Sequence, residues 1–216
     1  MLRRFWPPLG DYLRSHPFSY VLMVTLFALG MLFGAVAVNV LAPDQEARLQ
    51  QYIGGYLHTY SRPEGPVRSL VVQEAAGANA LRTAGLMWLL GLTVVGAPVV
   101  AVLLFARGFA LGFTVGFLVQ QWQWKGLGYA FAALLPHNLL AVPALIVVAV
   151  SALGFAGHVV RSRLILQTGD AVWPEMGRFT LAAATGAGLL VLAALVQGYI
   201  TPEMLNLAVR WTGSPG

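Results

Sequence analysis

The residues best suited to do chemistry in this sequence lie in one apolar stretch, between two prolines. Pro136 and Pro143 lie in an otherwise apolar segment, and His137 and Asn138 come directly after the first proline. Each proline removes a backbone hydrogen-bond donor, and a backbone broken at membrane depth is tolerated only where protein or a water-filled cavity surrounds it. The pattern predicts a broken helix whose free carbonyls are satisfied by His137 and Asn138. It leaves open whether the break is a structural kink or a binding element like the broken helices of transporters.

Other catalytic chemistry has little support in the sequence. There are no cysteines, so thiolate nucleophiles, thiolate metal sites and disulfides are excluded. The histidines have no metal-ligand spacing, and no acid occurs between Gly126 and Val160. The sequence contains neither a nucleophile elbow (G-x-S-x-G) nor a phosphate-binding loop. We therefore expect a protein that is not an enzyme and that uses no metal or other cofactor.

The composition is typical of a membrane protein. Hydrophobic residues make up 58% of the 216 residues and charged residues only 10%, whereas a soluble domain carries about 25% charge. The net charge of +5 comes from residues scattered along the chain, so we interpret it as a topology signal and expect no nucleic-acid partner. The sequence predicts a single integral-membrane domain, residues 1–216, surrounded by membrane lipid.

Five apolar stretches are candidates for crossing a bilayer, whose core needs about 20 helical residues. The third stretch is short for a span, and the fourth lies in the charge-free segment 126–160, which would give a sixth span if it were split. The prediction is an all-α, polytopic membrane helix bundle with five or six spans, one of them broken at the Pro-His-Asn motif. The approximate spans are residues 19–40, 86–106, 108–122, 128–157 and 179–200.

The arginines predict how the bundle is oriented. Three arginines precede the first span and three more precede the last. Positive charge favours the cytoplasmic side, and five spans put both segments on the same side. This predicts a bacterial cell-membrane protein with a cytoplasmic N-terminus, an extracytoplasmic C-terminus and a tight cytoplasmic turn at Arg107. Ala35 and Ala37 also resemble a signal-peptide cleavage site, but the apolar run before them is too long for a typical signal peptide, so we expect an uncleaved first span.

Residues 44–61 predict an amphipathic helix on the extracytoplasmic side. Asp44 and Glu46 suit the positive end of its dipole. The periodicity favours a helix that lies on the membrane or packs on the bundle, and it leaves open a docking surface for an extracytoplasmic partner. The apolar face, which we call the outer stripe, consists of Leu49, Tyr52, Ile53, Tyr56, Leu57 and Tyr60.

Glycines at every fourth position predict close packing of two spans. Gly30 and Gly34 lie in the first span, and Gly108, Gly112 and Gly116 lie in the third. Small residues at this spacing let helix backbones approach closely in a membrane. We expect them to pack helices within the chain, and the alternative is a homodimer face.

These features resemble the stage II sporulation protein M family of bacterial membrane proteins, over nearly the whole chain. One departure concerns Ala141, because the broader family tends to carry an acid at this position. The departure weakens any histidine–carboxylate chemistry, so His137 and Asn138 are carried over only as residues of the family motif. The resemblance rests on segments 30–39, 79–82, 107–112 and, above all, 135–143 (Leu-Pro-His-Asn-Leu-Leu-Ala-Val-Pro).

The resemblance implies a function that periodicity does not show. It implies a non-catalytic membrane scaffold of a peptidoglycan-remodelling complex that acts in engulfment during endospore formation. The implied partners are two septal cell-wall hydrolases, a lytic transglycosylase and an amidase/endopeptidase, and the implied location is the mother-cell septal membrane. The alternative is a membrane transporter or permease subunit with its site at the break between Pro136 and Pro143, which requires a polar cavity around His137 and Asn138.

Overall fold

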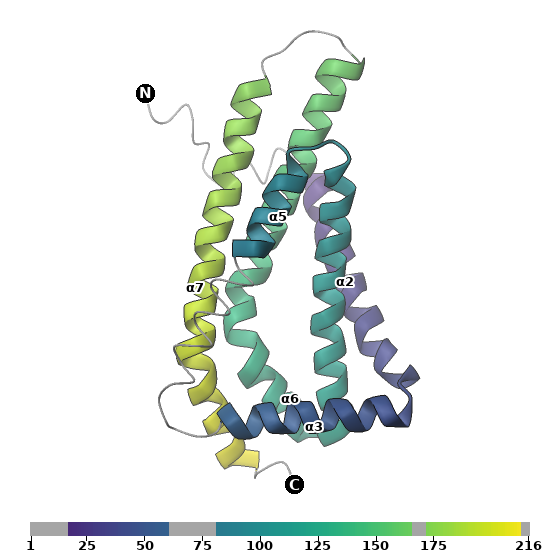
Figure 1. Ribbon diagram of the computed structural model, residues 1–216, viewed down its shortest axis with the longest axis vertical. Coiled ribbons are helices and arrows are strands. Elements are labelled where there is room, and N and C mark those ends of the chain that lie inside the picture. Colours follow the sequence, from purple (N-terminus) through teal and green to yellow (C-terminus); the bar gives the residue numbers. More distant parts are fainter. Residues whose placement is uncertain (1–16, 61–80, 166–171, 213–216) are drawn as a thin grey trace.

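The computed structural model describes residues 17–60, 81–165 and 172–212, and the regular structure in these ranges is all helical, which confirms the all-α part of the predicted fold class. The number of spans stays a prediction. Three helices, α2, α6 and α7, are long and apolar enough to cross a membrane. Figure 1 shows them as an elongated bundle with α3 lying across one end. The elements are α2 (Pro17–Ala37), the 3-10 helix η2 (Val38–Val40), α3 (Pro43–Tyr60), α5 (Leu81–Gly91), α6 (Gly96–Val159), the π-helix η4 (Val160–Ile165) and α7 (Val172–Thr212).

Helix α6 is a helical hairpin. It leaves the helical conformation at Gln123, where φ is 51° and ψ is −125°, a backbone conformation that L side chains rarely adopt. Gly126 lies so close to the Leu118 carbonyl that a Cβ atom at position 126 would overlap it. The chain therefore reverses at Gln123, and Figure 1 shows two antiparallel arms of α6. We call residues 96–122 the first arm and residues 124–159 the second arm.

The hairpin changes the predicted boundaries of the second and third spans. The sequence predicted spans at 86–106 and 108–122 that meet in a turn at Arg107. In the structure α5 ends at Gly91, α6 begins at Gly96, and Arg107 lies inside the first arm. A lone charge between two apolar stretches usually marks the end of a span, but here the helix carries the arginine into the bundle.

The turn between α5 and α6 is closed by Thr93. Its hydroxyl donates a hydrogen bond to the Leu90 carbonyl at 2.8 Å and accepts one from the Gly96 amide at 3.0 Å. The second bond satisfies one of the free amides at the start of α6, as a helix-capping side chain does. The backbone closes the same turn, because the Thr93 amide donates to the Leu90 carbonyl at 3.0 Å and the Gly96 amide also donates to the Thr93 carbonyl at 3.1 Å. The hydroxyl group therefore adds two bonds to a turn that backbone bonds also hold.

We expect Thr93→Val, which keeps the shape and removes the hydroxyl, to lower the free energy of unfolding by about 1–2 kcal/mol. Thr185→Val is the matched control, because the Thr185 hydroxyl is exposed and makes a single bond to the Leu181 carbonyl within α7. The midpoint of thermal unfolding in detergent measures both. Equal shifts in the two variants would show that Thr93 does not hold the turn.

The predicted break between Pro136 and Pro143 is wrong. Both prolines lie inside the second arm, which stays helical throughout, so the segment 126–160 is neither interrupted there nor split into two spans. A proline removes one donor and crowds the preceding turn, but a long helix packed on its neighbours can absorb this as a bend. Figure 1 shows the second arm curved near its middle.

Glycine contacts hold α2 against the first arm. A Cβ atom at Gly34 would overlap the Phe109 carbonyl, and one at Gly112 would overlap the Met31 carbonyl. Close approach of two backbones is what small residues at this spacing permit. The two predicted glycine motifs therefore face each other within the chain, and the faces that could have formed a homodimer are covered by this contact. The remaining contacts pair Gly30 with Phe105, Gly108 with Phe27, and Gly116 with Ala35, so the two helices run parallel.

The two ends of the bundle group elements that are distant in the sequence. One end carries α3, the reversal at Gln123 and the end of α7, and the other carries the start of α2, the turn before α6 and η4 (Figure 1). This grouping fits the prediction that the N-terminal segment and the segment before α7 lie on the same side. Which of the two ends faces the cytoplasm stays a prediction.

The main core lies where the second arm meets α5 and α7. Small residues on the second arm, among them Ala144, Ala149 and Ala152, are fully buried and let α7 approach closely. The rings of Phe155 and Phe179 stack with their centroids 5.8 Å apart. The second arm is thus fixed along its length, which holds its polar residues in place.

Candidate functional site

The two arms of α6 bring three polar side chains together inside the bundle. Arg107 on the first arm lies within electrostatic range of His137 on the second arm, and Asn138 follows His137. The His137 side chain is only 8% exposed, and Arg107 is partly buried. We call Arg107, His137 and Asn138 the polar cluster. The sequence predicted the last two as motif residues and placed Arg107 elsewhere, in a turn.

The polar cluster lies near the middle of both arms. At 1.5 Å per residue, Arg107 is about 16 Å along the helix from Gly96 and about 22 Å from the end of the first arm. His137 is about 20 Å along the second arm from its start. Because a membrane core is about 30 Å thick, a bilayer that covers the middle of both arms would place the polar cluster in its hydrocarbon region.

Two members of the polar cluster carry an unsatisfied polar atom. Nε of Arg107 and Oδ1 of Asn138 are buried without a hydrogen-bond partner among the described residues. Other atoms are satisfied: Nδ2 of Asn138 donates to the Leu134 carbonyl at 2.8 Å. A buried polar atom without a partner costs about 1–3 kcal/mol, and more if it is charged. Polar groups kept in a membrane at such a cost point to a functional position.

The charge of Arg107 has no acidic partner in its surroundings. The described part of the chain contains four acids, and all lie near helix ends: Asp44, Glu46, Glu175 and Glu203. No acid occurs in the sequence between Glu74 and Asp170, so neither arm carries one. The described residues therefore leave a positive charge without neutralisation near the middle of the first arm.

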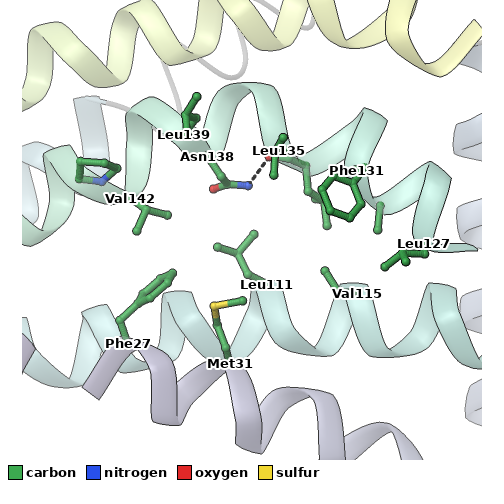
Figure 2. Close-up of a pocket in the computed structure, with 13 residues that line it drawn as sticks. Phe27, Met31, Leu111, Val115, Leu127, Phe131, Leu135, Asn138, Leu139 and Val142 are labelled. Atoms are coloured by element: carbon green, nitrogen blue, oxygen red, sulfur yellow. Dashed lines mark hydrogen bonds between the residues drawn. The ribbon is translucent and has the colours of Figure 1, made fainter. Parts of the chain in front are cut away.

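An apolar groove lies beside the polar cluster, between α2 and the two arms (Figure 2). Its volume is about 470 Å³. The groove is lined by two residues from α2, two from the first arm and nine from the second arm, the last between Leu127 and Pro143. Asn138 is the one polar residue among these lining residues. Figure 2 shows Asn138 facing Leu111 across the groove. The polar cavity that a transporter would need at this level is an apolar groove instead.

Among the described side chains of the outer stripe, some face the bundle and one faces away from it. Leu49 and Ile53 are partly buried, and Ile53 packs on a small buried group formed by Tyr129, Ala132 and Leu205. Tyr52, by contrast, is 75% exposed. The helix is thus packed on the tip of the α6 hairpin and the end of α7, with Tyr52 directed away from that contact.

A polar contact fixes the same helix from its first turn. The side chain of Gln121, near the tip of the hairpin, donates a hydrogen bond to the Glu46 carboxylate. The side chains of Tyr56, Leu57 and Tyr60 lie outside the described part of the structure. Whether the whole outer stripe contacts a partner therefore stays a prediction.

Sequence reasoning missed the pairing of Arg107 with His137. The signal was present: Trp122, Gln123 and Trp124 interrupt the apolar run, and Gly126 follows. Polar and aromatic residues of this kind are typical of a membrane interface. The predicted spans 108–122 and 128–157 place a reversal there, which sets Arg107 and His137 at similar distances along the two arms. The turn predicted at Arg107 concealed this relation.

Residues 23–202 match the family described as stage II sporulation protein M. The chain belongs to this family. The match runs from α2 to the greater part of α7 and includes the glycine contacts, the polar cluster and the hairpin. Comparisons with curated proteins and with solved structures gave no match. Family membership and the long apolar helices together identify a sporulation-related membrane protein.

Proposed function

We propose that the protein is a non-catalytic membrane scaffold that holds two cell-wall hydrolases together during engulfment. The hydrolases are a lytic transglycosylase and an amidase/endopeptidase, and the membrane is the septal membrane of the mother cell. The observation that carries the proposal is the family match over residues 23–202. In this proposal the end of the bundle that carries α3 is extracytoplasmic and the start of α2 is cytoplasmic.

The position of α3 supports a scaffold. A surface that is already rigid loses less conformational entropy when a partner binds. Glu46 and Ile53 fix α3 on the bundle, while Tyr52 is 75% exposed at the same end. Tyrosine is enriched at protein interfaces because it combines a large apolar ring with a hydroxyl group. We therefore place the hydrolase-docking surface on the exposed side of α3, around Tyr52.

The apolar character of the groove favours the scaffold over the permease alternative. A transported polar solute needs polar groups along its path. His137 is buried, and the groove beside Asn138 is otherwise apolar in the part of the chain that the structure describes. The permease alternative therefore loses the cavity on which it depended.

Tyr52→Asp tests the docking surface. We expect it to reduce recovery of the two hydrolases with the detergent-solubilised protein about tenfold. In the proposed complex the hydrolase covers the Tyr52 ring, and an aspartate in its place would carry a charge that must be desolvated. Gln50→Asp is the matched control, since Gln50 is exposed on α3 and receives the same charge off the outer stripe. Equal recovery with all three proteins would remove α3 as the docking surface.

A further inference from the structure

The polar cluster and the apolar groove lie side by side, and neither has an assigned ligand. We propose that together they bind a transmembrane helix of a partner protein that carries an aspartate or glutamate near the middle of the membrane. The inference deepens the proposed scaffold function and rests on it, because a scaffold within a membrane can hold a partner through a transmembrane helix of that partner.

A bound anion would neutralise the unpaired positive charge of Arg107. Its guanidinium carries five donors in a planar fork that matches a carboxylate. Nε has no partner among the described residues, and the electrostatic neighbour that the structure gives it is the histidine His137. A carboxylate brought to this position would neutralise the charge. Nε itself is buried, but the Arg107 side chain as a whole is only partly buried, so such a group would approach its uncovered part.

The groove supplies the apolar part of the contact. Arg107, Leu111 and Val115 lie at successive helical turns on one side of the first arm, and the latter two line the groove. The charge therefore lies one helical turn beyond Leu111, the residue that faces Asn138 across the groove (Figure 2). A helix lying along the groove would place its apolar side chains in it and its acid level with Arg107. Packing of this kind is what drives helix association in a membrane.

The depth of Arg107 favours a helix over a lipid headgroup. Phosphate groups lie outside the hydrocarbon core, about 15 Å from its centre, so they do not come level with a side chain near the middle of the first arm. The carboxylate of a transmembrane helix can lie at any depth along the helix. A second copy of this chain does not provide one from the described residues, because their acids all lie near helix ends. The occupant is therefore a helix of a different protein.

Binding of designed helices in vesicles tests the inference. The full-length protein is reconstituted in phosphatidylcholine vesicles with a label on a single cysteine at the exposed hairpin tip (Lys125→Cys), which is unique because the chain has no other cysteine. The probes are labelled polyleucine transmembrane peptides that carry aspartate, asparagine or leucine at the centre, and energy transfer reports binding. We expect the aspartate peptide to bind about tenfold more tightly than the leucine peptide, with the asparagine peptide between them.

Arginine variants show whether this preference comes from the polar cluster. Arg107→Gln should abolish it, Arg107→Lys should keep most of it, and Arg161→Gln, at an exposed arginine, should leave it unchanged. Unchanged gel-filtration profiles ensure that each variant is folded.

The inference is overturned if the leucine peptide binds as tightly as the aspartate peptide, if the preference survives in Arg107→Gln, or if no peptide binds. It is also overturned if phosphatidylglycerol in the vesicles removes the preference, since Arg107 would then serve a lipid. None of these results changes the expected recovery of the two hydrolases, so the proposed scaffold function is tested independently by that recovery.

Discussion

Gly112→Ala is expected to destabilise the protein, whereas Gly188→Ala is expected to stabilise it. A Cβ atom at Gly112 would overlap the backbone of α2 at Met31, and a backbone cannot move aside as a flexible side chain can. Overpacking of this kind costs about 1–3 kcal/mol. At Gly188 a Cβ atom meets nothing within 4 Å, so alanine there adds about 0.5–1 kcal/mol through its higher helix propensity.

Because Gly112→Ala and Gly188→Ala should change the stability of the protein in opposite directions, the two variants together test the contact between α2 and α6. Thermal unfolding midpoints of the two single variants in the same detergent give the comparison. Gly34→Ala, on the α2 side of the contact, should behave like Gly112→Ala because it would overlap the Phe109 carbonyl. If both Gly112→Ala and Gly34→Ala raise the midpoint as Gly188→Ala does, then α2 does not lie against the first arm.

Arg107→Met is expected to make the isolated protein more stable and less able to function. The variant replaces a partly buried cation, without an acidic partner among the described residues, by an unbranched apolar side chain that can fill the same space. Removing an unsatisfied charge from a membrane interior should stabilise the protein by about 1–3 kcal/mol. Arg161→Met is the control, because Arg161 is exposed in η4, directly after α6, and its effect should stay within about 0.5 kcal/mol.

The functional half of this prediction is measured separately. In a sporulating host that lacks its own copy, Arg107→Met should be inserted in the membrane at normal levels but should support engulfment poorly. A gain in stability with a loss of function is expected where a residue is kept for binding at a cost to the fold. A clear loss of stability would instead show that Arg107 is satisfied and holds the bundle together.

The features that sequence reasoning predicted well depend on local spacing. The small residues at Gly30, Gly34 and Gly112 specify a helix face by themselves, whatever lies opposite. The amphipathic helix of residues 44–61 is likewise predicted by the period of its side chains, and the structure places α3 over nearly the same range. Composition alone was enough for the all-helical membrane fold.

The features that sequence reasoning predicted poorly depend on tertiary structure. Pro136 and Pro143 favour a break in an isolated helix, but packing against α5 and α7 keeps the second arm helical. The reversal at Gln123 lies between the predicted spans 108–122 and 128–157, so its place was predicted, but its close fit, in which Gly126 lets the backbone fold back on Leu118, was not. Arg107 was assigned to a turn because its charge was judged without knowledge of what lies beside it. The groove could not be predicted either, because three segments distant in the sequence form it.

The most direct test of the scaffold is whether this protein bridges the two hydrolases. The transglycosylase and the amidase/endopeptidase from the same genome are expressed together in membranes, with and without this protein, and the first is purified by a tag in mild detergent. The scaffold proposal predicts that the second hydrolase is recovered with the first only when this protein is present, and that all three proteins elute as one complex. Recovery of the second hydrolase to the same extent without this protein, or no recovery with it, would contradict the proposal.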